Sequence, residues 1–141
     1  MRSGTGDANR VAMLMPPVSR FMTSNPHAIS SSQRLHHARS MMRELGIHHL
    51  PVVDDDKLVG IISDRDLSTI VLDDTVADAM TTDVAAVTTN APLDEVLDLM
   101  GAGKISSVVV TGSKGIEGIF TMTDALRAFS EFLGRVNQSD R

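Results

Sequence analysis

Residues 60–67 read "GIISDRDL" and residues 118–125 read "GIFTMTDA". Each stretch has a glycine, two apolar residues, a Ser or Thr, two variable residues and an aspartate, and the copies lie 58 residues apart. An apolar run followed by a hydroxyl residue and, three residues later, by an acid is typical of a strand that ends where a helix begins. The sequence therefore predicts the same strand-to-helix junction twice.

The repeat extends well beyond these two stretches. Residues 22–66 align with residues 80–124 without a gap and give ten identities in 45 positions, where chance would give about three. The identical pairs are Met22/Met80, Thr23/Thr81, Ala28/Ala86, Leu35/Leu93, Met42/Met100, Ile47/Ile105, Val52/Val110, Gly60/Gly118, Ile61/Ile119 and Asp66/Asp124. A fixed period of this length predicts a duplicated structural unit.

The first copy has the pattern of a strand, a helix, two strands and a second helix. A short strand is expected at 28–29, and a helix is expected between an N-cap at Ser32 and a stop at Gly46. The runs "HHLPVV" and "KLVGII" predict two strands joined by a polar turn at 54–57. A second helix is expected after Ser63.

The second copy repeats this order. Strand "AAVT" precedes a helix after Asn90, strands "SSVVVT" and "IEGIF" flank a turn at 112–115, and a helix is expected from Thr121 to about Leu133. Each half is thus β-α-β-β-α, with a right-handed crossover and then a hairpin. One such sheet is too small to bury its own face, so we predict an α/β (α+β) fold in which two tandem repeats pack sheet to sheet with pseudo-twofold symmetry.

These patterns predict the boundaries of the two repeats. We expect an N-terminal tail at 1–17, repeat one at 18–72, repeat two at 73–133 and a C-terminal tail at 134–141. The two repeats are expected to form one module. A chain of 141 residues is long enough for two small halves that share one core.

Composition excludes several classes of function. The net charge of −5 is opposite to the excess of basic residues that nucleic-acid-binding proteins carry. The absence of cysteine excludes disulfides, thiolate catalysis and cysteine-ligated metals. No apolar run approaches the roughly 20 residues of a membrane span, and no signal segment is recognised. A cytoplasmic location is expected.

The repeated Ser/Thr-x-x-Asp motif has two interpretations. In the first, Ser63 with Asp66 and Thr121 with Asp124 are only capping boxes. In the second, each junction binds a nucleotide, because a helix N-terminus and a hydroxyl suit a phosphate while a carboxylate accepts ribose hydroxyls. The motif glycines would then let a base approach the strand. Residue types alone leave both interpretations open.

The complete pattern resembles a known family. The stretch "VSRFMTSNPHAIS…HHLPVVDDDKLVGIISDRDL" looks like a CBS domain, and "VADAMTTDVAAVT…SSVVVTGSKGIEGIFTMTDAL" looks like its weaker partner. Together they resemble a CBS pair, or Bateman module, over roughly residues 18–130. The repeats take up nearly the whole chain, so a stand-alone pair is expected, with any regulated protein a separate polypeptide.

The resemblance implies a set of ligand-binding residues. Asp66 and Asp124 would hold ribose, and Ser63 and Thr121 would help to hold phosphate. Residues just before the "LPVV" strand, and their counterparts in repeat two, would line the base and phosphates, and backbone near the first strand would meet adenine. The residues expected to line the base and phosphates are Ile47, His48, His49, Ile105, Ser106 and Ser107. Those near the first strand, expected to meet adenine, are Asn25, Pro26, Ala28, Asp83, Val84 and Ala86. Arg65 and its counterpart Thr123 lie inside the motif.

The resemblance also implies a function. A CBS pair of this kind is expected to be a regulatory energy sensor that binds AMP, ADP or ATP, or alternatively S-adenosylmethionine or NADH. It is expected to need no cofactor, to form a homodimer and not to be an enzyme. The alternative is a CBS-like dimerisation or interaction module without ligand binding. Repeat two favours that alternative, because it has Ser106 and Ser107 where repeat one has two histidines, so only repeat one is expected to bring cations.

Metal sites are not expected. Adjacent histidines on a helix, such as His36 and His37, point about 100° apart and seldom ligate together. The acidic turn at 54–56 lacks an EF-hand acid at its fifth position, which is Leu58. "GAGKIS" at 101–106 lacks the Ser or Thr that follows Lys in a phosphate-binding loop. It is interpreted as a helix end.

Overall fold

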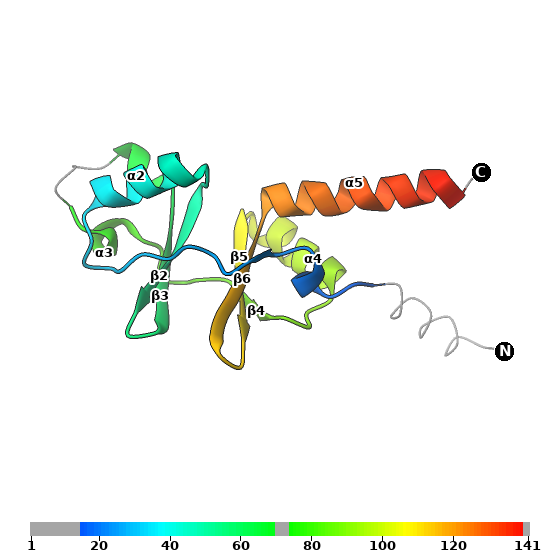
Figure 1. The fold of residues 1–141 in the computed structure, drawn as a ribbon, viewed down its shortest axis with the longest axis horizontal. Coiled ribbons are helices and arrows are strands. Elements are labelled where there is room, and N and C mark those ends of the chain that lie inside the picture. The colour runs from blue at the N-terminus through cyan, green and yellow to red at the C-terminus, as the bar shows by residue number, and fades with distance from the viewer. Residues whose placement is uncertain (1–14, 70–73, 140–141) are drawn as a thin grey trace.

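The structure is a computed structural model that describes residues 15–69 and 74–139 (Figure 1). The elements follow in the order η1 (Val18–Arg20), β1 (Thr23–Ser24), α2 (Leu35–Leu45), β2 (His49–Asp54), β3 (Lys57–Ser63), η2 (Asp66–Thr69), α3 (Val76–Ala79), β4 (Ala86–Thr88), α4 (Leu93–Gly103), β5 (Ser107–Gly112), β6 (Gly115–Thr121) and α5 (Met122–Ser139). Two of these, η1 and η2, are 3₁₀ helices. None of the helices in the described part is both long and apolar enough to cross a bilayer.

Two sheets carry the duplicated topology. One has the order β1-β6-β5-β4, and the other is the hairpin β2-β3. Single bridges extend the hairpin on both sides, with Ile29 parallel to Val52 and Thr81 antiparallel to Ile61. These bridges repeat the β4–β5 and β1–β6 pairings at the 58-residue offset. The two hairpins stand side by side, with β3 in contact with β6 (Figure 1). The predicted fold class is therefore confirmed.

The two repeats exchange their first segments. Thr23 of repeat one pairs with Ile119 of repeat two, and Thr81 of repeat two pairs with Ile61 of repeat one. The sequence did not predict this exchange, because the units expected from it were three-stranded and separate. Each sheet gains its outer strand from the other repeat, so neither half is complete without its neighbour.

The motif glycines allow this exchange. A Cβ on Gly118 would lie 2.3 Å from Met22 Sδ and 3.0 Å from the carbonyl oxygen of Thr23. A Cβ on Gly60 would likewise lie 2.7 Å from Met80 Sδ. The interpretation that these glycines admit a base is therefore wrong at this face of the strand, where the close neighbour is the exchanged segment.

Each half has its own core, and the other repeat completes it. The first core joins α2, β2 and β3 and includes Val76 of α3, which is fully buried. The second joins α4, β5, β6 and α5 and includes Val18 of η1, also fully buried. Burying a side chain of this size stabilises a fold by about 1.5–3 kcal/mol. The exchange is therefore fixed by packing as well as by strand pairing.

The helix ends differ in part from expectation. Gly46 ends α2 in the left-handed conformation, with φ at 65°, as predicted. The predicted N-cap at Ser32 is wrong, because α2 begins at Leu35 and its N-cap residue is Arg34. The serines before it are bound elsewhere: the Ser31 amide donates to Asp54 Oδ1 at 3.0 Å. They therefore fix the loop to β2 and leave the helix end uncapped by a side chain.

The second helices of the two repeats are unequal. After Ser63 the described chain forms only the four-residue η2, and residues 70–73 lie outside the description. After Thr121, α5 runs for 18 residues to Ser139, past the expected end near Leu133. The two halves therefore differ most at this position, and α5 extends beyond the rest of the described chain (Figure 1).

Candidate functional site

Both strand-to-helix junctions form capping boxes. The Ser63 amide donates to Asp66 Oδ2 at 2.8 Å, and the Asp66 amide donates to Ser63 Oγ at 3.4 Å. At the second junction the same two distances, between Thr121 and Asp124, are 2.9 and 3.4 Å. The hydroxyls also donate to the carboxylates, at 3.1 Å in each case. The capping contacts are therefore formed in both copies, and they leave the nucleotide-binding interpretation open.

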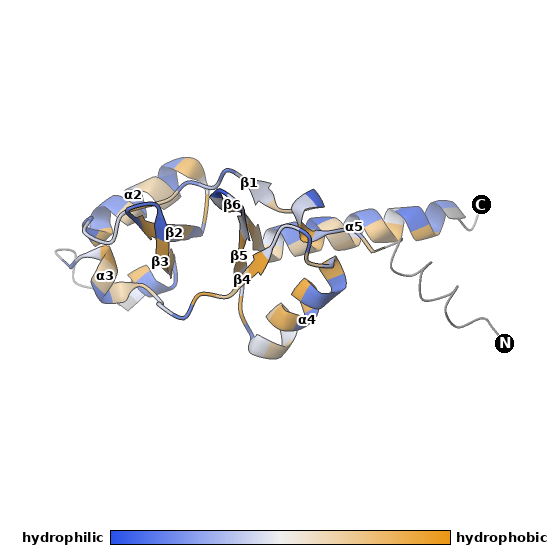
Figure 2. Ribbon diagram, turned by 90° about the horizontal axis from the view of Figure 1, so that it is seen from below, coloured by the Kyte–Doolittle hydropathy of each residue, from blue (hydrophilic) through white to orange (hydrophobic). Residues whose placement is uncertain are grey.

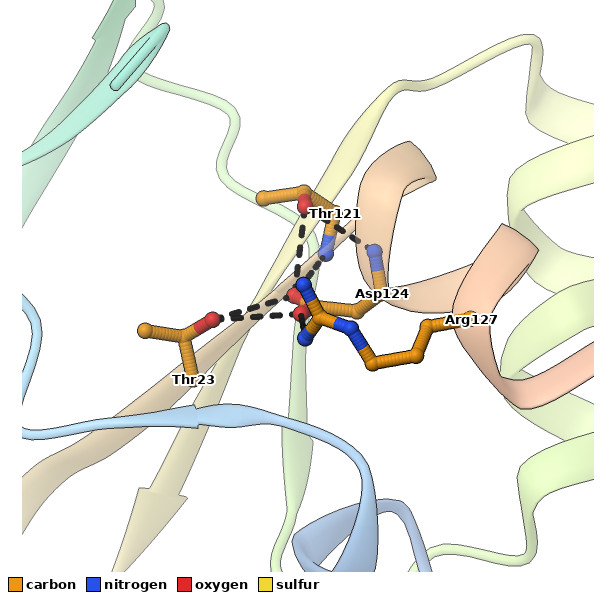
Figure 3. A network of polar contacts seen from close by, with 4 residues as sticks. All are labelled: Thr23, Thr121, Asp124 and Arg127. Atoms are coloured by element: carbon orange, nitrogen blue, oxygen red, sulfur yellow. Dashed lines mark hydrogen bonds and ion pairs between the residues drawn. The ribbon is translucent and has the colours of Figure 1, made fainter. Parts of the chain in front are cut away.

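Asp124 takes part in a larger network (Figure 3). Its Oδ1 accepts a hydrogen bond of 3.1 Å from Thr23 Oγ1 and lies 3.4 Å from Arg127 Nη1. The side chain of Asp124 is 2% exposed, whereas that of Arg127 is 68% exposed. A buried carboxylate is tolerated when donors and a cation compensate its charge. Here these partners come from β1, β6 and α5, so the charge lies where the two repeats meet.

A cleft of about 510 Å³ opens beside this network. Three segments form it: residues 23–27 around the end of β1, residues 46–49 between α2 and β2, and residues 119–127 at the β6–α5 junction. Four side chains that can carry positive charge line it, namely His27, His48, His49 and Arg127. The cleft therefore combines hydroxyls, a carboxylate and a helix N-terminus with basic side chains from both repeats.

The two adjacent histidines have different surroundings. His48 Nδ1 lies 2.8 Å from Asp64 Oδ2, and both side chains are largely exposed. His49 Nε2 lies 3.0 Å from Ser106 Oγ, so it joins the two repeats. Burial lowers the pKa of His49, and the nearby Asp64 carboxylate offsets this only in part. His49 is therefore mostly uncharged at neutral pH in the ligand-free protein.

The structure distributes the predicted site residues among several places. Eight line the cleft: Asn25, Pro26, Ile47, His48, His49, Thr121, Thr123 and Asp124. Arg65, Ile105 and Ser106 line a separate cavity of about 410 Å³ beside α4 and the start of α5. Ala28, again with Asn25 and Pro26, lines a third cavity of about 440 Å³. Ser63, Asp66, Asp83, Val84, Ala86 and Ser107 line none of these three cavities.

Sequence reasoning missed several residues of the cleft: Thr23, Ser24, His27, Gly46, Ile119, Met122 and Arg127. A signal existed for Thr23, which is identical to Thr81 in the repeat. A signal also existed for Arg127, which lies one helical turn after Asp124 and hence on the same face. The expectation that only repeat one brings cations is wrong, because Arg127 lines the cleft and Lys104 lines the cavity with Arg65.

The acidic turn has a structural role. Asp54 accepts hydrogen bonds from the Ser31 hydroxyl and amide, which lower the pKa of its carboxyl group. Across the described residues, no three His, Asp or Glu side chains are grouped so that they could hold a metal ion. The cleft beside Asp124 is therefore the strongest candidate site.

Comparison with known proteins places this fold and cleft in a family. The model of the CBS domain matches residues 18–73 and again residues 76–131. The chain belongs to the CBS domain family. Its two CBS domains stand in tandem, and together the matches include both strand-to-helix junctions and the whole lining of the cleft.

Solved structures of similar proteins have the same fold. A putative acetoin utilization protein from Vibrio cholerae is 32% identical, with a TM-score of 0.78 over 89% of this chain and 98% of that one. The CBS pair of protein MJ0100, in complex with 5′-methylthioadenosine and S-adenosyl-L-methionine, is 29% identical, with a TM-score of 0.78 over 83% and 98%. CBSX2 in complex with AMP is 28% identical, with a TM-score of 0.74 over 83% and 98%.

Longer enzymes contain a similar segment. The inosine-5′-monophosphate dehydrogenase of Thermoplasma acidophilum is 34% identical over 101 residues, which cover 71% of this chain and 21% of the enzyme. The chain therefore spans about a fifth of the length of this relative. The similarity concerns the CBS pair, and the activity of the whole enzyme does not follow from it.

Proposed function

We propose that this CBS pair is a regulatory module that binds an adenine nucleotide in the cleft beside Asp124. The proposal rests on one observation: Thr23, Asp124 and Arg127 line a single cleft together with the histidines of repeat one. The complexes of similar CBS pairs with AMP and with S-adenosyl-L-methionine support an adenosyl ligand. The ligand is AMP, ADP or ATP, with S-adenosylmethionine and NADH as alternatives.

Each part of a nucleotide has a suitable partner in the cleft. The Asp124 carboxylate is an acceptor for ribose hydroxyls, provided that Thr23 or Arg127 gives up its place. Phosphate oxygens suit the Arg127 guanidinium and the N-terminus of the 18-residue α5. Residues 25–27 and Ile119 offer backbone and apolar surface to adenine.

The module acts by changing shape and performs no chemistry of its own. A ligand that draws Asp124 away from Thr23 loosens β1 from the opposite repeat, because Thr23 is one of only two residues in β1. The exchanged segments would then transmit occupancy of the cleft to a separate protein. In this role the module is an energy sensor that works as a homodimer in the cytoplasm.

One observation favours a second candidate, an interaction module without a ligand. The Asp124 carboxylate already accepts from the Thr121 amide and hydroxyl and from Thr23, and it pairs with Arg127. These partners occupy about all of the roughly four acceptor positions of a carboxylate. In this alternative, the network only locks the two repeats together.

Calorimetry with AMP, ADP, ATP, S-adenosylmethionine and NADH separates the two candidates. We expect saturable binding of at least one of them and its loss in Asp124→Ala. The matched control is Asp78→Ala, because Asp78 forms a capping box with Thr75 at the start of α3, where its side chain is exposed and lies outside the cleft. Absence of heat and of any thermal shift with all five ligands would leave only the interaction module.

A further inference from the structure

A small cavity of about 290 Å³ adjoins the cleft and lies between α2 and η2. It shares Ile47 and His48 with the cleft, but it contains neither motif hydroxyl nor motif aspartate. Its apolar residues are Met42, Ile47 and Leu67, of which Met42 and Leu67 are buried. The α2 cavity, as we name it, is therefore a separate hollow with an apolar base.

Two arginines of α2 line the α2 cavity. Arg39 and Arg43 are four residues apart, so their side chains lie on the same side of the helix. Arg39 Nη2 donates to the carbonyl oxygen of Leu67 at 2.8 Å, which fixes this guanidinium at the junction of α2 and η2. A guanidinium has several N–H donors, and this hydrogen bond uses one of them. Arg43 is exposed, so both arginines have donors to offer to a ligand.

The positive charge of the α2 cavity is not fully balanced. Within residues 15–69 and 74–139, neither Arg39 nor Arg43 forms an ion pair. The acid in the lining is Asp64, whose Oδ2 lies 2.8 Å from His48 Nδ1. Two arginines against one aspartate leave an excess of one positive charge, which becomes two when His48 is protonated. The α2 cavity is therefore electropositive in a chain whose net charge is −5.

The second repeat forms the equivalent cavity without these arginines. At the 58-residue offset, the apolar residues of the α2 cavity correspond to residues that line the cavity beside α4, namely Met100, Ile105 and Ala125. Arg39 and Arg43 correspond to Leu97 and Gly101, which line that cavity as well. The hollow therefore forms whether or not arginines stand on its helix, so the fold does not require them there.

The first long helices of the two repeats have opposite charge. Besides its two arginines and two histidines, α2 has one acid, Glu44. In contrast, α4 has the acids Asp94, Glu95 and Asp98 and no basic residue. Hydrophilic residues lie beside hydrophobic ones along α2 (Figure 2). A local excess of one sign of charge raises the concentration of ions of the opposite sign. The charge on α2 therefore favours an anion at the α2 cavity.

We propose that Arg39, Arg43 and His48 form a phosphoryl-binding site in the α2 cavity, outside the cleft beside Asp124. Guanidinium groups bind phosphate oxygens through paired hydrogen bonds, and a phosphoryl group has enough acceptor oxygens for two arginines and a histidine. Pockets for drug-sized ligands usually measure about 300–1,000 Å³. The α2 cavity is slightly smaller than this, so it suits a phosphate or pyrophosphate group better than a whole nucleotide.

The phosphoryl group has two possible sources. One is a free phosphate compound, and the other is the outer phosphates of a nucleotide in the cleft, because the cleft and the α2 cavity share Ile47 and His48. The site goes beyond the proposed function, since it requires neither motif aspartate.

Titration with pyrophosphate and, separately, with ATP tests the site, with amide-resolved NMR at constant ionic strength as the measurement. We expect saturable shifts at residues 39–43 and 64–68. Arg43→Gln should weaken this binding by about tenfold or more, the size of a charge-assisted hydrogen bond. Arg39→Leu, which introduces the residue of repeat two, should do the same. The matched control is Arg135→Gln, which removes the same charge from α5 and should bind like the wild type.

The two titrations also identify the source. Saturable shifts with pyrophosphate would identify a free phosphate compound, and shifts with ATP alone would identify the outer phosphates of a nucleotide in the cleft. Either result supports the site only if Arg43→Gln weakens it. Circular dichroism checks that α2 is still formed in both arginine variants.

Two results would overturn the site. One is the absence of shifts at residues 39–43 and 64–68 with millimolar pyrophosphate or ATP. The other is equal binding by wild type and Arg43→Gln, because the anion would then not be held by the arginines. Since no motif aspartate lines the α2 cavity, the pyrophosphate titration succeeds or fails independently of nucleotide binding in the cleft.

Discussion

Thr23 joins the first segment of the chain to the motif aspartate of the other repeat, and its hydroxyl can be removed without changing its shape. Thr23→Val should lower the free energy of unfolding by about 1–3 kcal/mol, because the lost hydrogen bond goes to a buried carboxylate. Thr81→Val is the matched control at the equivalent position, which is exposed like Thr23 but has no hydrogen bond from its hydroxyl to the motif aspartate in the described residues. Urea denaturation measures both. Equal losses in the two variants would show that the Thr23 hydroxyl has no special role.

Arg127 is the exposed cation closest to the motif carboxylate. Arg127→Gln should weaken binding of ATP and ADP by about tenfold to a hundredfold, the size of a charge-assisted hydrogen bond to phosphate. Binding of adenosine, which has no phosphate, should be nearly unchanged or stronger, because Asp124 is then released from an ion pair. Arg135→Gln on the same helix is the control. Equal weakening of ATP and adenosine binding would contradict a phosphate contact.

His49 should make the ligand-free protein sensitive to mild acid. Burial lowers the pKa of His49 below its ordinary value of 6.5, so between these two pKa values the unfolded chain binds more protons than the folded one. The contribution of neutral His49 to stability is therefore present above about pH 6.5 and is lost as pH falls below that value. Unfolding free energies at pH 7.5 and pH 5.5 should differ less in His49→Gln than in wild type. An identical difference would assign the effect to other groups.

Local signals identified some site residues and missed others. The hydroxyl and carboxylate of each junction are three residues apart, so the sequence predicted Ser63 with Asp66 and Thr121 with Asp124, and it likewise predicted the stop at Gly46. The contact of Thr23 with Asp124 spans 101 residues. Nothing local to either residue indicates it, and the identity of Thr23 with Thr81 showed only that the position matters in both repeats.

At the scale of elements, the exchanged segments depend on the motif glycines. Gly118→Ala should destabilise the fold by about 1–3 kcal/mol, because the new Cβ would lie 2.3 Å from Met22 Sδ and 3.0 Å from the Thr23 carbonyl oxygen. Gly134→Ala on α5 is the control. It meets nothing within 4 Å and should stabilise by about 0.5–1 kcal/mol, because alanine favours a helix. Thermal denaturation of both variants measures the contrast, and equal effects would refute it.

The elements most readily predicted were those with strong periodic patterns. The strands of both hairpins and the helices α2 and α4 are formed close to their expected positions, because apolar alternation and helical spacing decide them locally. The exchange of β1 was not predicted, because β1 is only two exposed residues long and its pairing is set by packing of Val18 and Met22 on the opposite core. The length of α5 was underestimated, because its last apolar residues lie beyond the core that the repeat requires.

At the scale of the whole molecule, duplication and exchange explain why the site lies between the repeats. Each core contains a short helix from the other repeat, so the segments after β1 and α2 and the β6–α5 junction are brought to one cleft. Sequence comparison of the two copies predicted two related sites, one at each junction, with cations expected only from repeat one. The cleft beside Asp124 instead combines residues of both copies, and its basic side chains are not repeated at the equivalent positions, where His48, His49 and Arg127 correspond to Ser106, Ser107 and Thr69.

Titration of the isotopically labelled chain with AMP and ATP, followed by amide-resolved NMR, tests the central claim most directly. A nucleotide in the cleft should shift the amides of residues 23–27, 46–49 and 119–127 in a saturable way. The cavity lined by Val53, Asp56 and Lys114 is an internal control, because it also lies between the repeats but carries neither motif aspartate. The amides of Val53, Asp56 and Lys114 should stay unchanged, whereas that of Asn25, which lines both cavities, should shift. Shifts confined to that cavity, or no shifts at millimolar nucleotide, would contradict binding beside Asp124.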